Sequence, residues 1–134
     1  MRKIILLVLL GVFYGCVANA QKKKTSKKYK IEKTELEWKN ILTEEQYYIL
    51  REAGTERPFT HPYNNNKANG TYVCAACDTP LYVSKYKYDS GSGWPSFDRS
   101  VKGNVELDVD YKIGYARTEL KCNTCGGHLG HSFN

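Results

Sequence analysis

Apolar residues recur at helical spacing in two neighbouring segments of the chain. Each segment opens with the sequence of a capping box, Thr-Glu-Leu-Glu at 34–37 and Thr-Glu-Glu-Gln at 43–46. In such a box the first and fourth residues bond each other's backbone N–H groups. Apolar residues then follow at the spacing of an amphipathic helix. We therefore predict two short helices, the second of which ends at Gly54. Their apolar positions are Trp38, Ile41 and Leu42 in the first helix, and Tyr47 and Leu50 in the second.

Downstream of Gly54 the pattern changes to short runs rich in β-branched and aromatic residues. Prolines, the asparagines at 64–66 and the pair Asn69-Gly70 mark loops and turns between these runs. The composition of the runs is that of strands. The sequence thus predicts one mainly β domain of antiparallel strands that follows the two helices. The predicted strands are residues 71–73, 81–83, 105–109 and 111–120.

The first 20 residues have the pattern of an export signal. The basic pair Arg2-Lys3 precedes an apolar run at 4–12, and Ala18-Asn19-Ala20 offers the small residues that a signal peptidase accepts. We expect residues 1–20 to be a signal peptide that is cleaved after Ala20. One alternative is a retained anchor, although the run is shorter than the roughly 20 residues of a membrane span.

A second alternative is lipoprotein processing at Cys16, which follows Gly15. All of these routes export the protein, and we expect it in the periplasm or envelope of a bacterium. We expect membrane attachment only for a form that is lipidated at Cys16.

The net charge of +6 comes from the N-terminal part of the chain. Residues 1–30 hold eight of the 20 basic residues and none of the 14 acidic ones, so residues 31–134 carry a formal charge of −2. Six lysines lie within residues 21–30, and we expect residues 21–33 to form a solvated, lysine-rich tether. Because the rest of the chain is acidic, we do not expect nucleic acid as a partner.

Four of the five cysteines form two Cys-x-x-Cys pairs, Cys74 with Cys77 and Cys122 with Cys125. Each pair lies at the end of a predicted strand, and two such pairs supply the four thiolates of a tetrahedral Zn²⁺ site. Two disulfides are the alternative, because an exported protein meets oxidising conditions. A thioredoxin-like redox motif would need a strand–helix context that this sequence lacks. We predict a structural zinc site that joins two ends of the β domain.

Further motifs follow one another in the strand-rich half. They are Glu56-Arg57-Pro58-Phe59-Thr60, Gly70-Thr71-Tyr72-Val73-Cys74, Gly91-Ser92-Gly93-Trp94-Pro95-Ser96-Phe97, Ala116-Arg117-Thr118-Glu119, and Cys-x-x-Cys-Gly-Gly-His-Leu-Gly-His-Ser-Phe at 122–133. Together they strongly resemble the B-type methionine sulfoxide reductases, which reduce the R epimer of methionine sulfoxide in peptides. The resemblance covers about residues 35–133. It implies two antiparallel sheets with short N-terminal helices, and a four-cysteine zinc site far from the chemistry.

The resemblance also implies roles for particular residues. In the family a cysteine thiolate attacks the sulfoxide sulfur while an acid protonates the departing oxygen, and a second thiol then reduces the sulfenic acid. Trp94 is expected to hold the S-methyl group, and His131 is expected to orient and protonate the substrate. An assisting carboxylate is expected among Glu106, Asp108 and Asp110, of which Glu106 is preferred. Oxidised methionine in proteins and a thiol reductant such as thioredoxin are the implied partners.

The sequence departs from the family pattern at its thiols. The family nucleophile lies downstream of the histidine motif, in an Arg-Tyr-Cys-x-Asn-Ser type of strand, and no cysteine follows Cys125 in the 134 residues. Ser92 stands where many members have the resolving cysteine. We expect residues 34–134 to be a reductase domain without its final strand, as a fragment or premature stop in preference to a pseudoenzyme.

The 134-residue chain itself is expected to be inactive. The competing function is that of a zinc-binding module which binds oxidised methionine without reducing it. Outside the roles implied by the family, His61 and His128 are expected to be structural.

Overall fold

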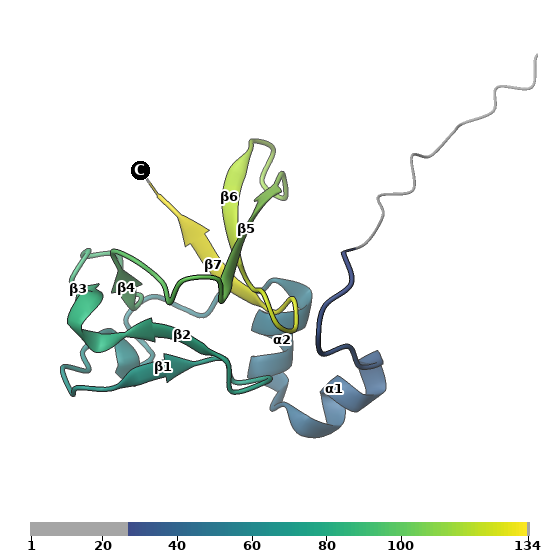
Figure 1. Ribbon diagram of the computed structural model, residues 1–134. Coiled ribbons are helices and arrows are strands. Elements are labelled where there is room, and N and C mark those ends of the chain that lie inside the picture. Colours follow the sequence, from purple (N-terminus) through teal and green to yellow (C-terminus); the bar gives the residue numbers. More distant parts are fainter. Residues whose placement is uncertain (1–26, 134) are drawn as a thin grey trace, which may run out of the picture.

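The computed structural model describes residues 27–133. The expected signal peptide, with Ala20 and Cys16, lies outside the described residues. Two helices lead into seven strands (Figure 1). One short 3₁₀ helix precedes the first strand, and another lies between the second and third strands. In chain order these are α1 (Glu35–Ile41), α2 (Glu44–Glu52), η1 (Pro62–Asn64), β1 (Thr71–Val73), β2 (Pro80–Val83), η2 (Ser84–Tyr86), β3 (Lys87–Tyr88), β4 (Ser96–Phe97), β5 (Val105–Asp110), β6 (Arg117–Cys122) and β7 (His128–Ser132).

Both predicted helices and both capping boxes are confirmed. Thr34 Oγ1 accepts a hydrogen bond from the Glu37 N–H at 3.3 Å, and a Glu37 carboxylate oxygen accepts from the Thr34 N–H at 2.7 Å. Thr43 and Gln46 make the same reciprocal pair of bonds at α2. The side chain of Ile41 is exposed, and this segment contributes Trp38 of α1 and the C-cap residue Leu42 to the core.

The strands form antiparallel sheets, as predicted, but they divide into three hydrogen-bonded sheets. β1 pairs with β2, β3 pairs with β4, and β5, β6 and β7 form a three-stranded sheet in that order. The strand predicted at 111–120 is wrong in its first half, because residues 111–116 make the turn between β5 and β6. Gly114 in this turn has φ of +90°, and its N–H donates to the Tyr111 carbonyl at 3.0 Å.

Three strands are absent from the sequence prediction. β3 and β4 have two residues each, which is too short for a periodic pattern. β7 is composed of His-Leu-Gly-His-Ser, which does not have the composition of a strand.

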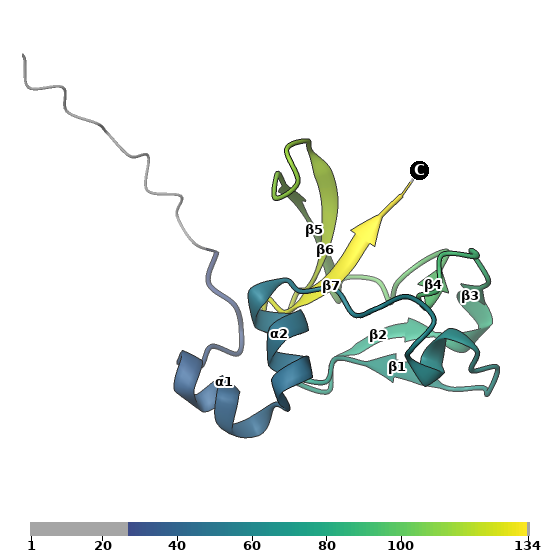
Figure 2. The ribbon, with the colours of Figure 1, turned by 180° about the vertical axis from the view of Figure 1, so that it is seen from behind.

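The two opposite views in Figures 1 and 2 show how these parts are arranged. The helices lie at one end of the β1–β2 ladder and the β3–β4 pair lies toward the other. The β5–β6 hairpin projects away from both, and β7 runs beside it. Within residues 27–133, no helix has the length and the apolar run needed to span a membrane.

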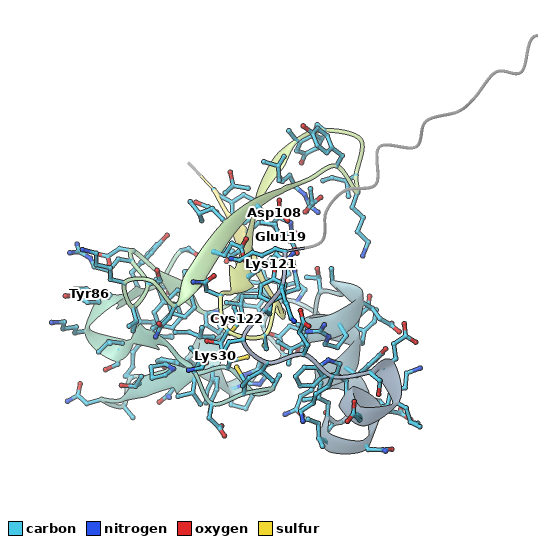
Figure 3. All side chains as sticks on the ribbon, turned by 45° about the vertical axis from the view of Figure 1, so that its right-hand side comes forward. Lys30, Tyr86, Asp108, Glu119, Lys121 and Cys122 are labelled. Atoms are coloured by element: carbon cyan, nitrogen blue, oxygen red, sulfur yellow. The ribbon has the colours of Figure 1, made fainter. Side chains whose placement is uncertain are left out.

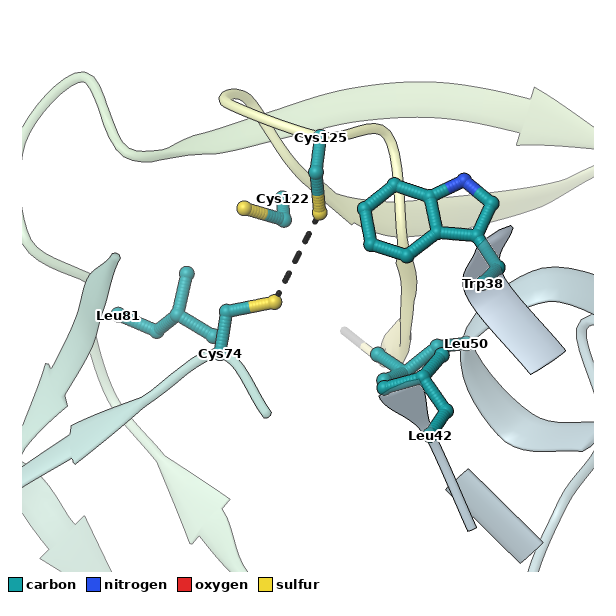
Figure 4. Close-up of a cluster of buried hydrophobic side chains, with 7 residues drawn as sticks. All are labelled: Trp38, Leu42, Leu50, Cys74, Leu81, Cys122 and Cys125. Carbon is teal, nitrogen blue, oxygen red and sulfur yellow. Dashed lines mark hydrogen bonds between the residues drawn. The ribbon is translucent and has the colours of Figure 1, made fainter. Parts of the chain in front are cut away.

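The buried core is small and is built around the cysteines (Figure 4). Trp38, Leu42 and Leu50 come from the helical end, and Leu81 comes from β2. The remaining buried members of the cluster are Cys74, Cys122 and Cys125. The buried side chains of the helical end therefore pack against the sheets mainly through the cysteine cluster.

The described end of the predicted tether makes contacts with the domain, although its lysines are exposed. Residues 27–31, which we call the strap, lie against the turn that carries Cys122 and Cys125. The Ile31 N–H donates to the Thr124 carbonyl at 3.0 Å, and the Ile31 side chain packs against the core cluster.

Candidate metal centre and active site

The four cysteines lie on two turns of the same backbone geometry. In each turn the N–H of the first cysteine donates to the carbonyl five residues later, and its own carbonyl accepts from the N–H four residues later. The bonds are Cys74 to Thr79 and Asp78 to Cys74 at 2.9 and 2.8 Å, and Cys122 to Gly127 and Gly126 to Cys122 at 2.8 and 2.8 Å. The fourth residue after the first cysteine is left-handed in both turns, with φ of 57° at Asp78 and 72° at Gly126. Gly126 indicates this turn in the sequence, because glycine adopts a positive φ without steric cost. Asp78 indicates it less clearly, because aspartate adopts this conformation less often.

The two turns bring their sulfur atoms into one cluster. Cys74 Sγ lies 3.8 Å from Cys125 Sγ, and Cys77 Sγ lies 3.6 Å from Cys122 Sγ. The dashed line in Figure 4 marks the contact between Cys74 and Cys125. All four sulfurs lie within 4.8 Å of one another. Four thiolates that surround one ion tetrahedrally at ~2.3 Å lie about 3.8 Å apart, so the donor set fits Zn²⁺. A disulfide needs an S–S distance of about 2.05 Å, and the four cysteines are free thiols.

The thiols compete for charge in this cluster. Hydrogen bonds from the Cys125 and Cys74 thiols lower the pKa of Cys122, while hydrogen bonding to Cys122 raises the pKa of Cys74. A thiolate at Cys122 therefore favours the protonated forms of Cys74 and Cys125. A dication removes this competition because it stabilises all four thiolates together. With four cysteine ligands no position remains open for a substrate, so zinc here would be structural.

A second cluster of ionisable side chains covers one face of the β5–β6–β7 sheet. The register pairs Glu106 with Lys121, Asp108 with Glu119, and Asp110 with Arg117, and it also pairs Glu119 with His131. Cross-strand partners share a face of a sheet. Figure 3 shows Asp108, Glu119 and Lys121 together on this sheet. The opposite face of β5 presents Leu107 and Val109, which are exposed.

His131 is held by a carboxylate at the end of this face. Its Nε2 contacts Asp110 Oδ2, and Arg117 Nη2 lies 3.1 Å from each Asp110 oxygen. The hydrogen bond to His131, the Lys112 N–H and the Arg117 guanidinium keep the pKa of Asp110 well below its usual range. An ionised carboxylate can only accept, so the proton of this contact belongs to His131 Nε2.

The indole of Trp94 is anchored by the loop that carries the Glu56–Thr60 motif. Trp94 Nε1 donates to the Glu56 carbonyl at 3.0 Å, and the Phe59 N–H donates to the Gly93 carbonyl at 2.8 Å. Gly93 has φ of +87°, and a Cβ there would lie 2.8 Å from Phe59. Only glycine allows this close approach of the two loops.

Residues 42–134 match the SelR domain family. A peptide methionine sulfoxide reductase MsrB of Agrobacterium fabrum is 54% identical over 105 residues, which cover 78% of this chain and 78% of the relative. A protein of the same name from Leptospira interrogans is 53% identical over 107 residues, 79% of this chain and 82% of the relative. Peptide methionine sulfoxide reductase B1, chloroplastic, from Arabidopsis thaliana is 50% identical over 102 residues, 75% of this chain and 50% of the relative.

The chain belongs to the B family of peptide methionine sulfoxide reductases. The resemblance seen in the sequence motifs is thereby confirmed. The antiparallel sheets, the two helices and the four-cysteine cluster agree with membership of this family.

In this methionine sulfoxide reductase B domain the carboxylate next to His131 is Asp110, not the preferred Glu106. Glu106 lies at the other end of β5, where its Oε2 is 2.8 Å from Lys27 Nζ in the strap. The three acidic residues of β5 share one face, so their sequence spacing does not distinguish them. The register between β5, β6 and β7 decides which one meets the histidine.

The remaining residues singled out in the sequence, His128, His61 and Ser92, each make a polar contact. His128 is buried, and its Nδ1 lies 2.6 Å from Glu119 Oε1, a contact that no pattern in the sequence indicates. His61 caps η1 by accepting the Tyr63 N–H. Ser92 Oγ lies 2.8 Å from Ser90 Oγ within a group of hydroxyls.

The two main predicted site residues, Trp94 and His131, are fixed by different parts of the domain. Among residues 27–133, no hydrogen bond or ring contact links Trp94 to His131. Trp94 is fixed to the 56–59 loop, and His131 is fixed to β5. A surface hollow lies elsewhere, and it contains none of the predicted site residues: its lining is Lys85, Tyr86, Lys87, Tyr88 and Asp98.

Proposed function

We propose that this domain serves the reduction of methionine-R-sulfoxide in peptides and proteins to methionine, by a thiol mechanism whose nucleophilic cysteine is not among residues 1–134. The observation that carries the proposal is the family match, which spans both Trp94 and His131 at up to 54% identity to the reductases named above. The contacts of these residues support it, because each side chain is held in place by a different loop or strand.

The proposed chemistry transfers one oxygen atom from sulfur to sulfur. A cysteine thiolate attacks the sulfoxide sulfur and forms a bond to it, and the sulfoxide oxygen takes up a proton. The hydroxyl group then passes to the cysteine sulfur as the S–O bond and the new S–S bond break. Methionine leaves as the thioether, and the cysteine keeps the oxygen as sulfenic acid. An external thiol reductant such as thioredoxin then forms a disulfide with this cysteine and releases water.

In this reaction Trp94 supplies an aromatic surface for the S-methyl group, and its N–H bond to Glu56 fixes the plane of the ring. His131 orients the sulfoxide and delivers the proton. We assign the assisting carboxylate to Asp110, since it holds His131 Nε2.

The thiol is the part of this chemistry that residues 1–134 do not supply. Four of the five cysteines form the metal cluster, and zinc-bound thiolates are committed to the ion. The fifth, Cys16, lies in the proposed export signal. We therefore propose that the 134-residue polypeptide binds methionine-R-sulfoxide and does not reduce it.

We further propose that the protein is exported and acts on oxidised proteins of the bacterial envelope. This proposal is supported by the sequence of residues 1–20. The thiol donor would then be a thioredoxin-like protein of the same compartment, and attachment to the membrane would require lipidation at Cys16.

The test uses the zinc-loaded 134-residue polypeptide and a peptide with either epimer of methionine sulfoxide. We expect binding that favours the R epimer, and no methionine product with dithiothreitol. Trp94→Ala should weaken binding about tenfold, while Tyr88→Ala, at an exposed aromatic side chain, should leave it unchanged. R-selective turnover would overturn our account of the thiol. Equal affinity for both epimers would overturn the proposed substrate site.

A further inference from the structure

The strap, residues 27–31, lies before the region that matches the family, yet it contacts the metal cluster's second turn. Its side chains alternate between the domain and solvent. Tyr29 and Ile31 are partly buried, whereas Lys28 and Lys30 are exposed. Tyr29 and Ile31 therefore face the domain, while the lysines beside them face solvent.

The closest contact joins Tyr29 to Gly126, the residue directly after Cys125. A Cβ at Gly126 would lie 2.4 Å from Tyr29 Cε2, so the ring rests directly on the backbone of the turn. Lys121 Nζ lies over the Tyr29 ring, 5.8 Å from its centroid, and Lys27 Nζ is 5.3 Å from the same centroid. Tyr29 is therefore held from several directions at the turn that presents two of the metal ligands.

Polar contacts fix the strap on both sides of this ring. The Ile31 N–H donates to the Thr124 carbonyl, between the two cysteines, at 3.0 Å. Lys27 Nζ donates to Asn123 Oδ1 at 2.7 Å and lies 2.8 Å from Glu106 Oε2. All of these partners except Glu106 belong to the turn 122–127.

We propose that the strap holds the Cys122–Cys125 turn closed and thereby retains zinc. A chelator takes zinc from a four-thiolate site only after a ligand sulfur moves away or becomes accessible. Cys122 and Cys125 are buried, and the turn cannot open without breaking the Tyr29 and Ile31 contacts. The opening of the strap is thus a local step that precedes metal loss, at a free energy below that of global unfolding. This role is independent of sulfoxide reduction.

The test measures zinc release from the zinc-loaded chain to an excess of 4-(2-pyridylazo)resorcinol under native conditions. Tyr29→Ala should accelerate release about tenfold, and Lys27→Ala about twofold, since exposed ion pairs contribute little. The matched controls are Tyr111→Ala, at an exposed tyrosine of the β5–β6 turn, and Lys28→Ala, at the exposed neighbour of Lys27. Both controls should release zinc at the rate of the parent chain.

Hydrogen exchange of the Ile31 amide reports directly on strap opening. In Tyr29→Ala this amide should exchange faster, while amides of β6 that pair with β5 remain protected. Loss of Ile31 protection with an unchanged rate of zinc release would overturn the proposal, because zinc would then leave by way of Cys77, the less buried cysteine. If Tyr29→Ala does not fold, Lys27→Ala takes its place in this test. Faster exchange of the Ile31 amide in Lys27→Ala with an unchanged rate of zinc release would also overturn the proposal.

A double-mutant cycle with Gly126→Ala tests whether Tyr29 is the responsible contact. An added Cβ strains the backbone at φ of +72° and also collides with the Tyr29 ring. The acceleration caused by Gly126→Ala should be smaller when Tyr29 is already alanine, because only the backbone strain remains. Equal acceleration in both backgrounds would show that the ring does not close the turn.

Discussion

Removal of zinc should unfold this domain rather than merely loosen it. Three of the seven buried residues of the core are cysteines, and Trp38, Leu42 and Leu50 from the helical end pack around them. Without the ion the four sulfurs lie within 4.8 Å of one another with no dication to stabilise their negative charge. Structural zinc contributes about 10–16 kcal/mol of binding free energy in zinc-finger peptides. A small domain has a net stability of only about 5–15 kcal/mol. The expected apo state is therefore largely unfolded.

The assay uses Trp94→Phe, which leaves Trp38 as the single tryptophan, since the chain has two. Trp38 is 2% exposed in the folded domain, and its emission should shift to the red when zinc is removed with EDTA under reducing conditions at neutral pH. Circular dichroism measures the accompanying loss of secondary structure. Addition of Zn²⁺ should restore both signals, and Mg²⁺ should not, because thiolates are poor ligands for magnesium. An apo protein that keeps blue emission and a cooperative thermal transition within a few degrees of the zinc form would refute this reasoning.

Two further changes test the core and the charged face. Trp38→Ala should lower the free energy of unfolding by about 3–5 kcal/mol in urea titrations, whereas Leu36→Ala, 69% exposed on the same helix, should have little effect; equal losses would contradict the assigned packing of α1. Asp110→Asn should flatten the acid limb of the stability–pH curve. The depressed pKa of Asp110 stabilises the folded state above the unfolded value of about 3.9, and this contribution is lost as pH falls below it. The difference between parent and variant should therefore be largest at neutral pH and shrink in acid, and a difference that is independent of pH would contradict the ion pair.

Local interactions made part of the fold predictable. A capping box needs only residues three apart, so Thr34 with Glu37 and Thr43 with Gln46 predicted both helix starts correctly. The strand predicted across Tyr111–Leu120 was wrong over residues 111–116, because β-rich composition does not reveal the turn at Gly114. β7 was missed because pairing with β6, rather than its own composition, makes it a strand.

The sequence alone determined the four cysteines that cluster and the family of this protein. Each Cys-x-x-Cys turn is closed by backbone bonds that span four or five residues, so its ability to present two sulfurs is a local property. Only the tertiary structure decided that His131 meets Asp110 instead of Glu106, because three carboxylates at alternate positions are equivalent until the strands pair in register. It also decided that residues 27–31 of the expected lysine tether lie against the Cys122–Cys125 turn. That contact depends on a glycine nearly 100 residues away, and no pattern within residues 27–31 encodes it.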